Sequence, residues 1–307
     1  MRTNSLTEAA LLVSIFTILS LAVMYIPIIS VLMMVVLSVP HAVLTWRNGL
    51  KAGLIAVVAS AVVLSLFIDI ISTFMFITLF ALVGTVIGYC SKRYSAGKTL
   101  VAGAIVGSIS FGIVVFVVEI ITGLDIFADM ISVYEQSIIS LGEASETLSF
   151  DVEAIKRQLE LLTTYLKPAV LVIFGFMTSY INFKFFGIIG RRLRIEVPEV
   201  PSIFEWSFPK WLAALYVIGT ALMYFTQPET TLNYVGMNLS IVLTWPVLFQ
   251  GVALVIAFIG QYIKSRLFFL LLFIMILTNS FIMQVVIILG LFDIFFDYQG
   301  WLKERRN

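Results

Sequence analysis

The chain has 307 residues, of which 61% are hydrophobic and only 12% are charged. A soluble protein of this size could not cover so much apolar surface, because charged residues usually make up about a quarter of a globular domain. The net charge of +1 and the single cysteine, Cys90, argue against a nucleic-acid partner, an internal disulfide and a cysteine-rich metal site. The composition therefore predicts an all-α integral membrane protein.

Nine apolar runs are candidates for membrane-spanning helices, which need about 20 mainly apolar residues to cross the hydrocarbon. In lipid, backbone groups must be hydrogen-bonded within their own segment, so each run is predicted to be a helix. Prolines, glycines and charges separate the runs. In chain order the predicted helices cover about 6–26, 29–46, 50–68, 70–90, 99–122, 168–190, 210–227, 238–260 and 267–290.

The positions of lysine and arginine predict that the N-terminus lies in the cytoplasm of a cell-membrane protein. With this orientation the outer loops hold only Lys156, Arg157 and Lys167. Cytoplasmic loops of membrane proteins carry an excess of these two residues. The predicted cytoplasmic set is Arg2, Arg47, Lys51, Lys92, Arg93, Lys98, Lys184, Arg191, Arg192, Arg194, Lys210, Lys264 and Arg266.

The C-terminal tail does not fit nine crossings, which would place Lys303, Arg305 and Arg306 outside the cell. A break at Thr278-Asn279-Ser280 would instead make the last run a re-entrant hairpin and return the tail to the cytoplasm. Such a turn requires that protein bury it. The sequence leaves the choice between eight and nine spans open.

The stretch 123–167 is predicted to be an extracellular helical hairpin, because it is acidic and carries two apolar stripes at helical spacing. It could rest on the bundle or on lipid, cover an outward-facing pocket as a lid, or bind another protein. A second irregular segment, 191–209, contains three arginines and several prolines. We interpret it as a cytoplasmic linker between a six-helix bundle, 1–190, and a C-terminal membrane extension of two or three spans, 210–307.

No catalytic, metal or cofactor motif occurs in the sequence, so neither an enzyme nor a bound cofactor is expected. His41 is the only histidine, too few for a zinc site without cysteines. Tyr25, Asp69 and Glu119 lie near the outer ends of predicted spans. Ionisable groups are costly in the bilayer, so these three residues are candidates for an outward-facing substrate pocket. The alternative is that Asp69 and Glu119 simply reach the outer interface.

Pairs of small residues predict close helix packing. The pairs Gly84/Gly88 and Gly103/Gly107 have the four-residue spacing that lets helix backbones approach, and Ala10/Ser14 has it more weakly. The sequence does not decide whether the packed neighbour belongs to this chain or to another subunit.

Roughly residues 1–190 of the chain resemble the substrate-binding S components of energy-coupling-factor (ECF) vitamin transporters, which are six-helix bundles with both ends in the cytoplasm. The resemblance rests on the first helix after Leu6-Thr7-Glu8-Ala9-Ala10, the outer loop at Tyr25-Ile26-Pro27, and the inner turn Trp46 to Gly53. The whole chain, with its ending Gly290 to Tyr298, is similar to the YybS family of bacterial membrane proteins. The name of that family describes no activity, and its members are regarded as distant relatives of S components.

The resemblance implies a small-molecule binding or transport subunit without its own ATPase. Its expected partners are the bilayer, a small ligand, and the transmembrane coupling subunit and ATPases of an ECF-type module. S components use small residues of the first helix to contact the coupling subunit, and Ala9, Ala10 and Ser14 could serve, although Val13 replaces the second alanine of the usual pattern. The alternative is a membrane scaffold or regulator that binds other proteins.

Overall fold

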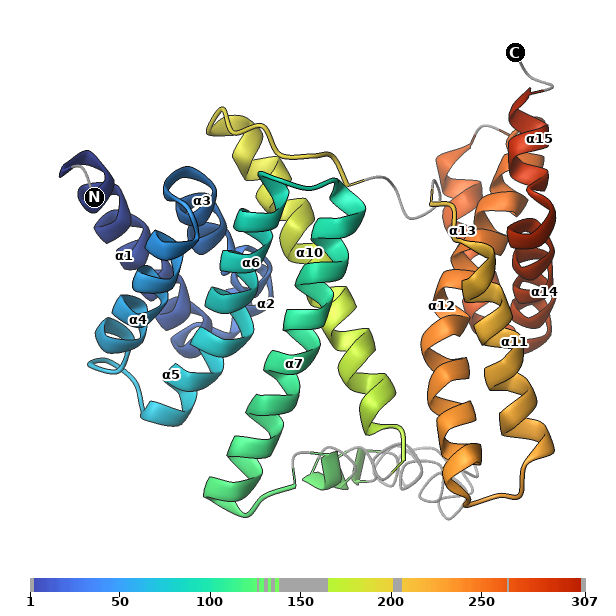
Figure 1. Ribbon diagram of the computed structural model, residues 1–307, viewed down its shortest axis with the longest axis horizontal. Coiled ribbons are helices and arrows are strands. Elements are labelled where there is room, and N and C mark those ends of the chain that lie inside the picture. Colours follow the sequence, from blue (N-terminus) through green and yellow to red (C-terminus); the bar gives the residue numbers. More distant parts are fainter. Residues whose placement is uncertain are drawn as a thin grey trace. The chain divides into compact units, whose positions relative to one another are not determined.

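The computed structural model describes residues 3–125, 127–129, 132–133, 136–137, 165–200, 206–263 and 265–304. Within these residues every regular element is a helix, which confirms the prediction of an all-α membrane protein. The chain divides into two compact units, Met1–Val200 and Pro201–Asn307, called unit 1 and unit 2 below (Figure 1). The division falls within the predicted linker 191–209.

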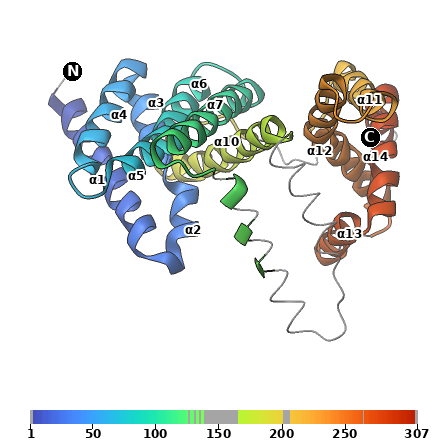
Figure 2. The same cartoon turned by 90° about the horizontal axis from the view of Figure 1, so that it is seen from below.

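Unit 1 contains the helices that cover the first six apolar runs. They are α1 (Thr3–Tyr25), α2 (Pro27–Val36), α3 (Val39–Asn48), α4 (Leu50–Leu64), α5 (Ile70–Phe76), a π-helical turn (Ile77–Ala81), α6 (Leu82–Ser91), α7 (Ala96–Thr122) and α10 (Lys167–Arg192). Helices α7 and α10 pack against each other, as do α3 and α6, and α6 also contacts α7 (Figure 2). The α-helix of the predicted second run is interrupted between Val36 and Val39, yet Ser30–Asn48 is still one candidate membrane span.

Local sequence explains where these helices begin and end. Pro27 and Pro40 lie in the first turns of α2 and α3, where the missing N–H has no intrahelical partner. Gly49 joins α3 to α4 with φ +85°, a conformation that glycine adopts without steric cost. Asp69 begins α5 because its side chain accepts a hydrogen bond from the Ser72 amide at 2.9 Å.

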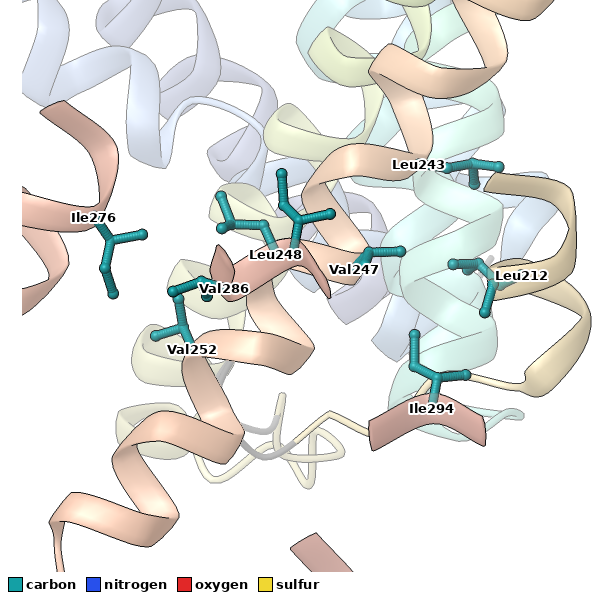
Figure 3. Close-up of a cluster of buried hydrophobic side chains, with 10 residues drawn as sticks. Leu212, Leu243, Val247, Leu248, Val252, Ile276, Val286 and Ile294 are labelled. Atoms are coloured by element: carbon teal, nitrogen blue, oxygen red, sulfur yellow. The ribbon is translucent and has the colours of Figure 1, made fainter. Parts of the chain in front are cut away.

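Unit 2 contains α11 (Lys210–Phe225), α12 (Thr231–Ile259), α13 (Arg266–Thr278), α14 (Ser280–Phe296) and α15 (Tyr298–Glu304). Figure 3 shows its buried apolar cluster, to which α11, α12, α13 and α14 all contribute. Gly251 on α12 and Gly290 on α14 allow the tightest contact. A Cβ atom at either glycine would overlap with the backbone of the opposite helix. The Gly290 of the C-terminal motif therefore serves helix packing.

The helix lengths give a smaller number of complete spans than nine. Within the described residues six helical segments are long and apolar enough to cross a membrane, and the pair α13 and α14 would make a seventh. That pair is bent by 105° at Asn279, the break that the sequence suggested. Helices α4 and α11, with 15 and 16 residues, would each reach only roughly 22–24 Å at 1.5 Å per residue. The predicted hairpin 123–167 lies mostly outside the described residues.

Candidate functional site

One arginine, Arg47, is hydrogen-bonded to groups at the ends of two other helices. The ribbon in Figure 1 shows the N-terminus at one end of unit 1, where α1 begins. Arg47, at the end of α3, donates to a Glu8 carboxylate oxygen on α1 and to the Leu193 carbonyl oxygen beyond α10, the latter at 3.1 Å. Asn48 Nδ2 donates to the second oxygen of Glu8 at 3.1 Å. The guanidinium therefore fixes the ends of α1, α3 and α10 relative to one another, because a planar donor fork can serve several acceptors.

Two further cations at this end of unit 1 lie over aromatic rings. Lys92 Nζ donates to the Trp46 carbonyl oxygen at 2.7 Å and lies 4.7 Å from the centre of the Trp46 ring. The Arg93 guanidinium lies 4.1 Å from the centre of the Tyr89 ring. Several of the cations that predict a cytoplasmic N-terminus thus gather at one end of the unit. The side of the membrane on which this end lies stays a prediction.

Unit 1 also buries polar side chains between its helices. His41 on α3 is 2% exposed, and its Nε2 lies 3.2 Å from the Ser60 hydroxyl oxygen on α4. The Phe16 ring of α1 packs edge-on against the imidazole, with 4.6 Å between the ring centres. The other ring nitrogen, Nδ1, has no hydrogen-bond partner among the described residues. A neutral imidazole can either donate or accept there, depending on its tautomer.

Five further buried polar atoms of unit 1 also lack a hydrogen-bond partner among the described residues. Within the described part of the chain, the atoms without a hydrogen-bond partner are also Thr45 Oγ1, Trp46 Nε1, Thr73 Oγ1, Thr85 Oγ1 and Asn182 Oδ1. Thr45 lies one turn beyond His41 on α3, and Thr85 lies on α6, which packs directly on α3. Leaving such a group unpaired costs about 1–3 kcal/mol, so a concentration of them in one unit requires an explanation.

The three predicted substrate residues lie at the surface. Tyr25 is 65% exposed at the end of α1, and Glu119 is exposed in the last turn of α7. Asp69 is exposed and caps α5, and the hydrogen bonds from Ser72 hold the pKa of its carboxyl group below the usual value. Within the described residues, no hydrogen bond or ion pair joins any two of them. The carboxylate of Asp69 thus has a local structural task.

The four glycines of the predicted packing pairs contact helices of the same unit. A Cβ atom at Gly84 or Gly88 on α6 would overlap with the α3 backbone at Ser38 or Ala42. On α7, Gly103 lies against Ser179 of α10 and Gly107 against Gly175. The neighbours that the sequence left open are therefore α3 and α10.

The small residues of α1 divide between two faces. Ala10 and Ser14 are exposed, and the Ser14 hydroxyl donates to the Ala10 carbonyl oxygen at 2.9 Å. Ala9 is partly buried against a cluster that contains Val13, Leu44, Ala52 and Ala56. Val13 is 8% exposed, so the residue that departs from the S-component pattern is an internal packing residue. The face with Ala10 and Ser14 remains accessible to another helix.

Sequence reasoning missed a buried polar network in unit 2. Asp293 on α14 is 1% exposed, its Oδ2 accepts a hydrogen bond from Gln250 Nε2 at 2.6 Å, and its Oδ1 accepts from the Gln299 amide at 2.8 Å. The Phe208 amide, just before α11, donates to Gln250 Oε1 at 3.4 Å. A carboxylate and a glutamine within apolar runs are the signal that could have revealed this network. It joins α12, α14, α15 and the start of α11.

The chain is similar to a known protein family whose description agrees with a membrane location. A family model described as a predicted membrane protein (DUF2232) matches residues 14–294, most of the chain. The chain belongs to this family. The chain is also 25% identical to the uncharacterized protein YybS of Bacillus subtilis (strain 168). The alignment extends over 313 residues and covers 98% of this chain and 99% of YybS. The expected resemblance to the YybS family is confirmed. No solved structure matches this DUF2232 protein.

Proposed function

We propose that the protein is a small-molecule binding or transport subunit without an ATPase of its own, with unit 1 as its binding module. The polar interior of unit 1 carries this proposal. His41 Nδ1, Thr85 Oγ1 and Asn182 Oδ1 are buried there and have no hydrogen-bond partner among the described residues. Such atoms can bind the polar groups of a small ligand, and binding would offset the cost of having left them unpaired.

The proposal also agrees with the S-component resemblance of residues 1–190, and it changes the expected location of the ligand. The outer candidates Tyr25 and Glu119 are exposed, whereas the unpaired groups are buried side chains of α3, α5, α6 and α10. Residues that bind ligands are often kept at a cost in stability. We therefore expect the unpaired hydroxyl groups to destabilise the free protein and to stabilise the bound one.

Thr85→Val tests this expectation, because valine keeps the shape of the side chain and removes the hydroxyl group. The purified full chain would be screened by thermal shift against vitamins, nucleobases and other small polar metabolites. We expect Thr85→Val to raise the melting temperature of the free protein and to reduce the shift produced by a ligand. Thr17→Val is the matched control, because the buried Thr17 hydroxyl already donates to the Val13 carbonyl oxygen at 3.0 Å.

The screen has two results that would contradict the proposal. One is the absence of any ligand-induced shift. The other is a ligand whose shift is the same in Thr85→Val and in the unchanged protein. Glu119→Gln separates the interior site from the outer pocket predicted from the sequence: weaker binding in that variant would favour the outer pocket with Asp69 and Tyr25, and unchanged affinity would assign Glu119 to the interface.

The exposed face of α1 supports a second function, that of a scaffold or of a subunit coupled to other membrane proteins. Ala10 and Ser14 are exposed there, one helical turn apart, which suits close contact with a transmembrane helix. Co-purification of the membrane-extracted protein, before and after Ala10→Leu, would distinguish the partners. A coupling subunit with ATPases, lost in the variant, fits transport, whereas other membrane proteins in its absence fit a scaffold.

A further inference from the structure

The end of α10 is closed by hydrogen bonds around a residue with positive φ. Arg194 has φ +54°, its amide donates to the Arg191 carbonyl oxygen at 3.2 Å, and the Ile195 amide donates to the Gly190 carbonyl oxygen at 2.9 Å. This pair of bonds reverses the chain direction at a helix C-terminus. Ile195 is then buried at 3% exposure, so the following residues are held against the helix.

The reversed chain forms a groove with α10. Val197 contacts Gly190, and the groove between them has a volume of about 220 Å³. Its walls come from the last turns of α10 and from the segment after Ile195. The lining residues are Phe183, Lys184, Gly187, Ile188, Arg191, Val197, Pro198, Glu199 and Val200. Gly187 leaves open space, since a Cβ atom there would meet nothing within 4 Å.

The charges in the groove favour an anion. The lining contains two cations, Lys184 and Arg191, and one carboxylate, that of Glu199, which lies 3.0 Å from Arg191. The two side chains of this ion pair are 63% and 83% exposed, so the pair is weak and Glu199 can give way to a stronger anion. Among the described residues, Lys184 Nζ donates to the Tyr180 hydroxyl oxygen at 3.3 Å and lies 5.4 Å from the centre of the Tyr180 ring, so it keeps donors for a ligand.

We propose that this groove binds the phosphate group of an anionic phospholipid, with Lys184 and Arg191 as its ligands. Helix α10 is a candidate membrane span that ends at Arg192, so the groove lies where a span leaves the hydrocarbon and lipid phosphates are found. The volume is below the roughly 300–1,000 Å³ of clefts that take drug-sized ligands, which suits a headgroup. Ile188, exposed on the same helix, would lie beside the acyl chains.

The test uses the purified full chain in detergent and short-chain phosphatidylglycerol, with phosphatidylcholine as the zwitterionic comparison. Binding is measured by thermal shift and by native mass spectrometry. We expect phosphatidylglycerol to bind at least about tenfold more tightly than phosphatidylcholine. Lys184→Gln should weaken phosphatidylglycerol binding by about tenfold, the value of one contact of about 1.4 kcal/mol. Inorganic phosphate distinguishes the free ion from the lipid, and we expect it to produce no shift at the same concentrations.

Two variants make the proposal sharper. Glu199→Gln removes the competing carboxylate and should strengthen phosphatidylglycerol binding, a gain that misfolding cannot imitate. Gly187→Leu should fill the groove and abolish binding, and its helix should form at least as well as before. Lys98→Gln, which removes an exposed cation elsewhere in unit 1, is the control. If Lys98→Gln weakened binding as much as Lys184→Gln, or if Glu199→Gln left affinity unchanged, the groove would not be the site.

Discussion

The buried carboxylate of Asp293 should stabilise unit 2 through its bond to Gln250. Asp293→Ala removes the acceptor of the bonds from Gln250 Nε2 and from the Gln299 amide, while Gln250→Leu removes one of the two donors that the described residues direct to the carboxylate. Both sites are nearly inaccessible, so water cannot replace the lost partner. Each single substitution should therefore cost more than the loss of an exposed hydrogen bond.

The expected magnitude follows from the two hydrogen bonds. A hydrogen bond to a charged group contributes about 1.5–3 kcal/mol, and Asp293→Ala loses two of them. Because the variant also no longer buries a carboxylate, the net cost should be about 3 kcal/mol. Asp293→Asn keeps the acceptor for the Gln299 amide but places its Nδ2 donor against the Gln250 Nε2 donor, so it should cost about 2 kcal/mol. In a double-mutant cycle with Gln250→Leu, the coupling energy should be about 2 kcal/mol, because the two side chains share one direct bond.

The free energies of unfolding are measured on the full chain, which is solubilised in a mild detergent and then unfolded with a denaturing one. Hydrogen exchange of the peptide that contains α15 gives a local measure, because Asp293 holds the Gln299 amide. A variant in which the hydrogen-bonded state of that amide loses about 2 kcal/mol of stability should exchange the amide about 30-fold faster. Thr244→Val, on α12, is the control, since its hydroxyl donates only within its helix, to Ser240. A coupling energy within about 0.3 kcal/mol of zero, with unchanged α15 exchange, would refute the reasoning.

Three further predictions concern the packing, the end of helix α10 and the pH dependence of unit 1. Gly88→Leu should destabilise the protein by about 3 kcal/mol in thermal melts, because its side chain would overlap with the α3 backbone, whereas Gly97→Ala, with open space around it, should be neutral or slightly stabilising. Arg194→Gly should stabilise by about 1 kcal/mol, since only glycine adopts φ +54° without cost; Arg194→Gln, which keeps the cost, should not. Burial raises the pKa of the Asp125 carboxyl, but hydrogen bonds from the Ala128 amide and Lys167 lower it by more. Its stabilisation is therefore complete above the ordinary pKa of aspartate and lost as the pH falls through the lower folded value, and Asp125→Asn should remove this acid dependence while costing less than about 1 kcal/mol at neutral pH.

The sequence predicted the helices well because lipid imposes a simple rule on them. Apolar length alone located α7, α10 and α12, and the polar Asn279 within a long apolar run located the break between α13 and α14. Apolar length does not predict a break within an apolar run when the break leaves few backbone groups without a hydrogen bond. The break between α2 and α3 is one such case, because Pro40 lies in the first turn of the second helix.

The candidate site was harder to predict because burial depends on which helices meet. Asp69 and Glu119 are candidates from the sequence because they lie near the outer ends of predicted spans, and both are exposed in the structure. Gln250 and Asp293 are 43 residues apart in sequence and meet only because Gly251 and Gly290 bring α12 and α14 into contact. Periodicity shows which face of a helix is apolar, but it does not show which polar residue finds a partner on another helix.

The hydrogen bonds around Asp293 also indicate on which side of the membrane the C-terminal tail lies relative to the linker. Gln250 bonds both to Asp293 near the end of α14 and to Phe208 just before α11, so unit 2 is entered and left at the same end. Leu212 and Ile294 lie in the same cluster and place the two helix ends together (Figure 3). If the linker is cytoplasmic, the bent pair α13 and α14 re-enters, and Lys303 lies inside with the other cations. The double variant Cys90→Ser, Lys303→Cys tests this by cysteine labelling in intact cells. The new cysteine should resist a membrane-impermeant reagent, whereas rapid labelling would place the tail outside and favour nine crossings.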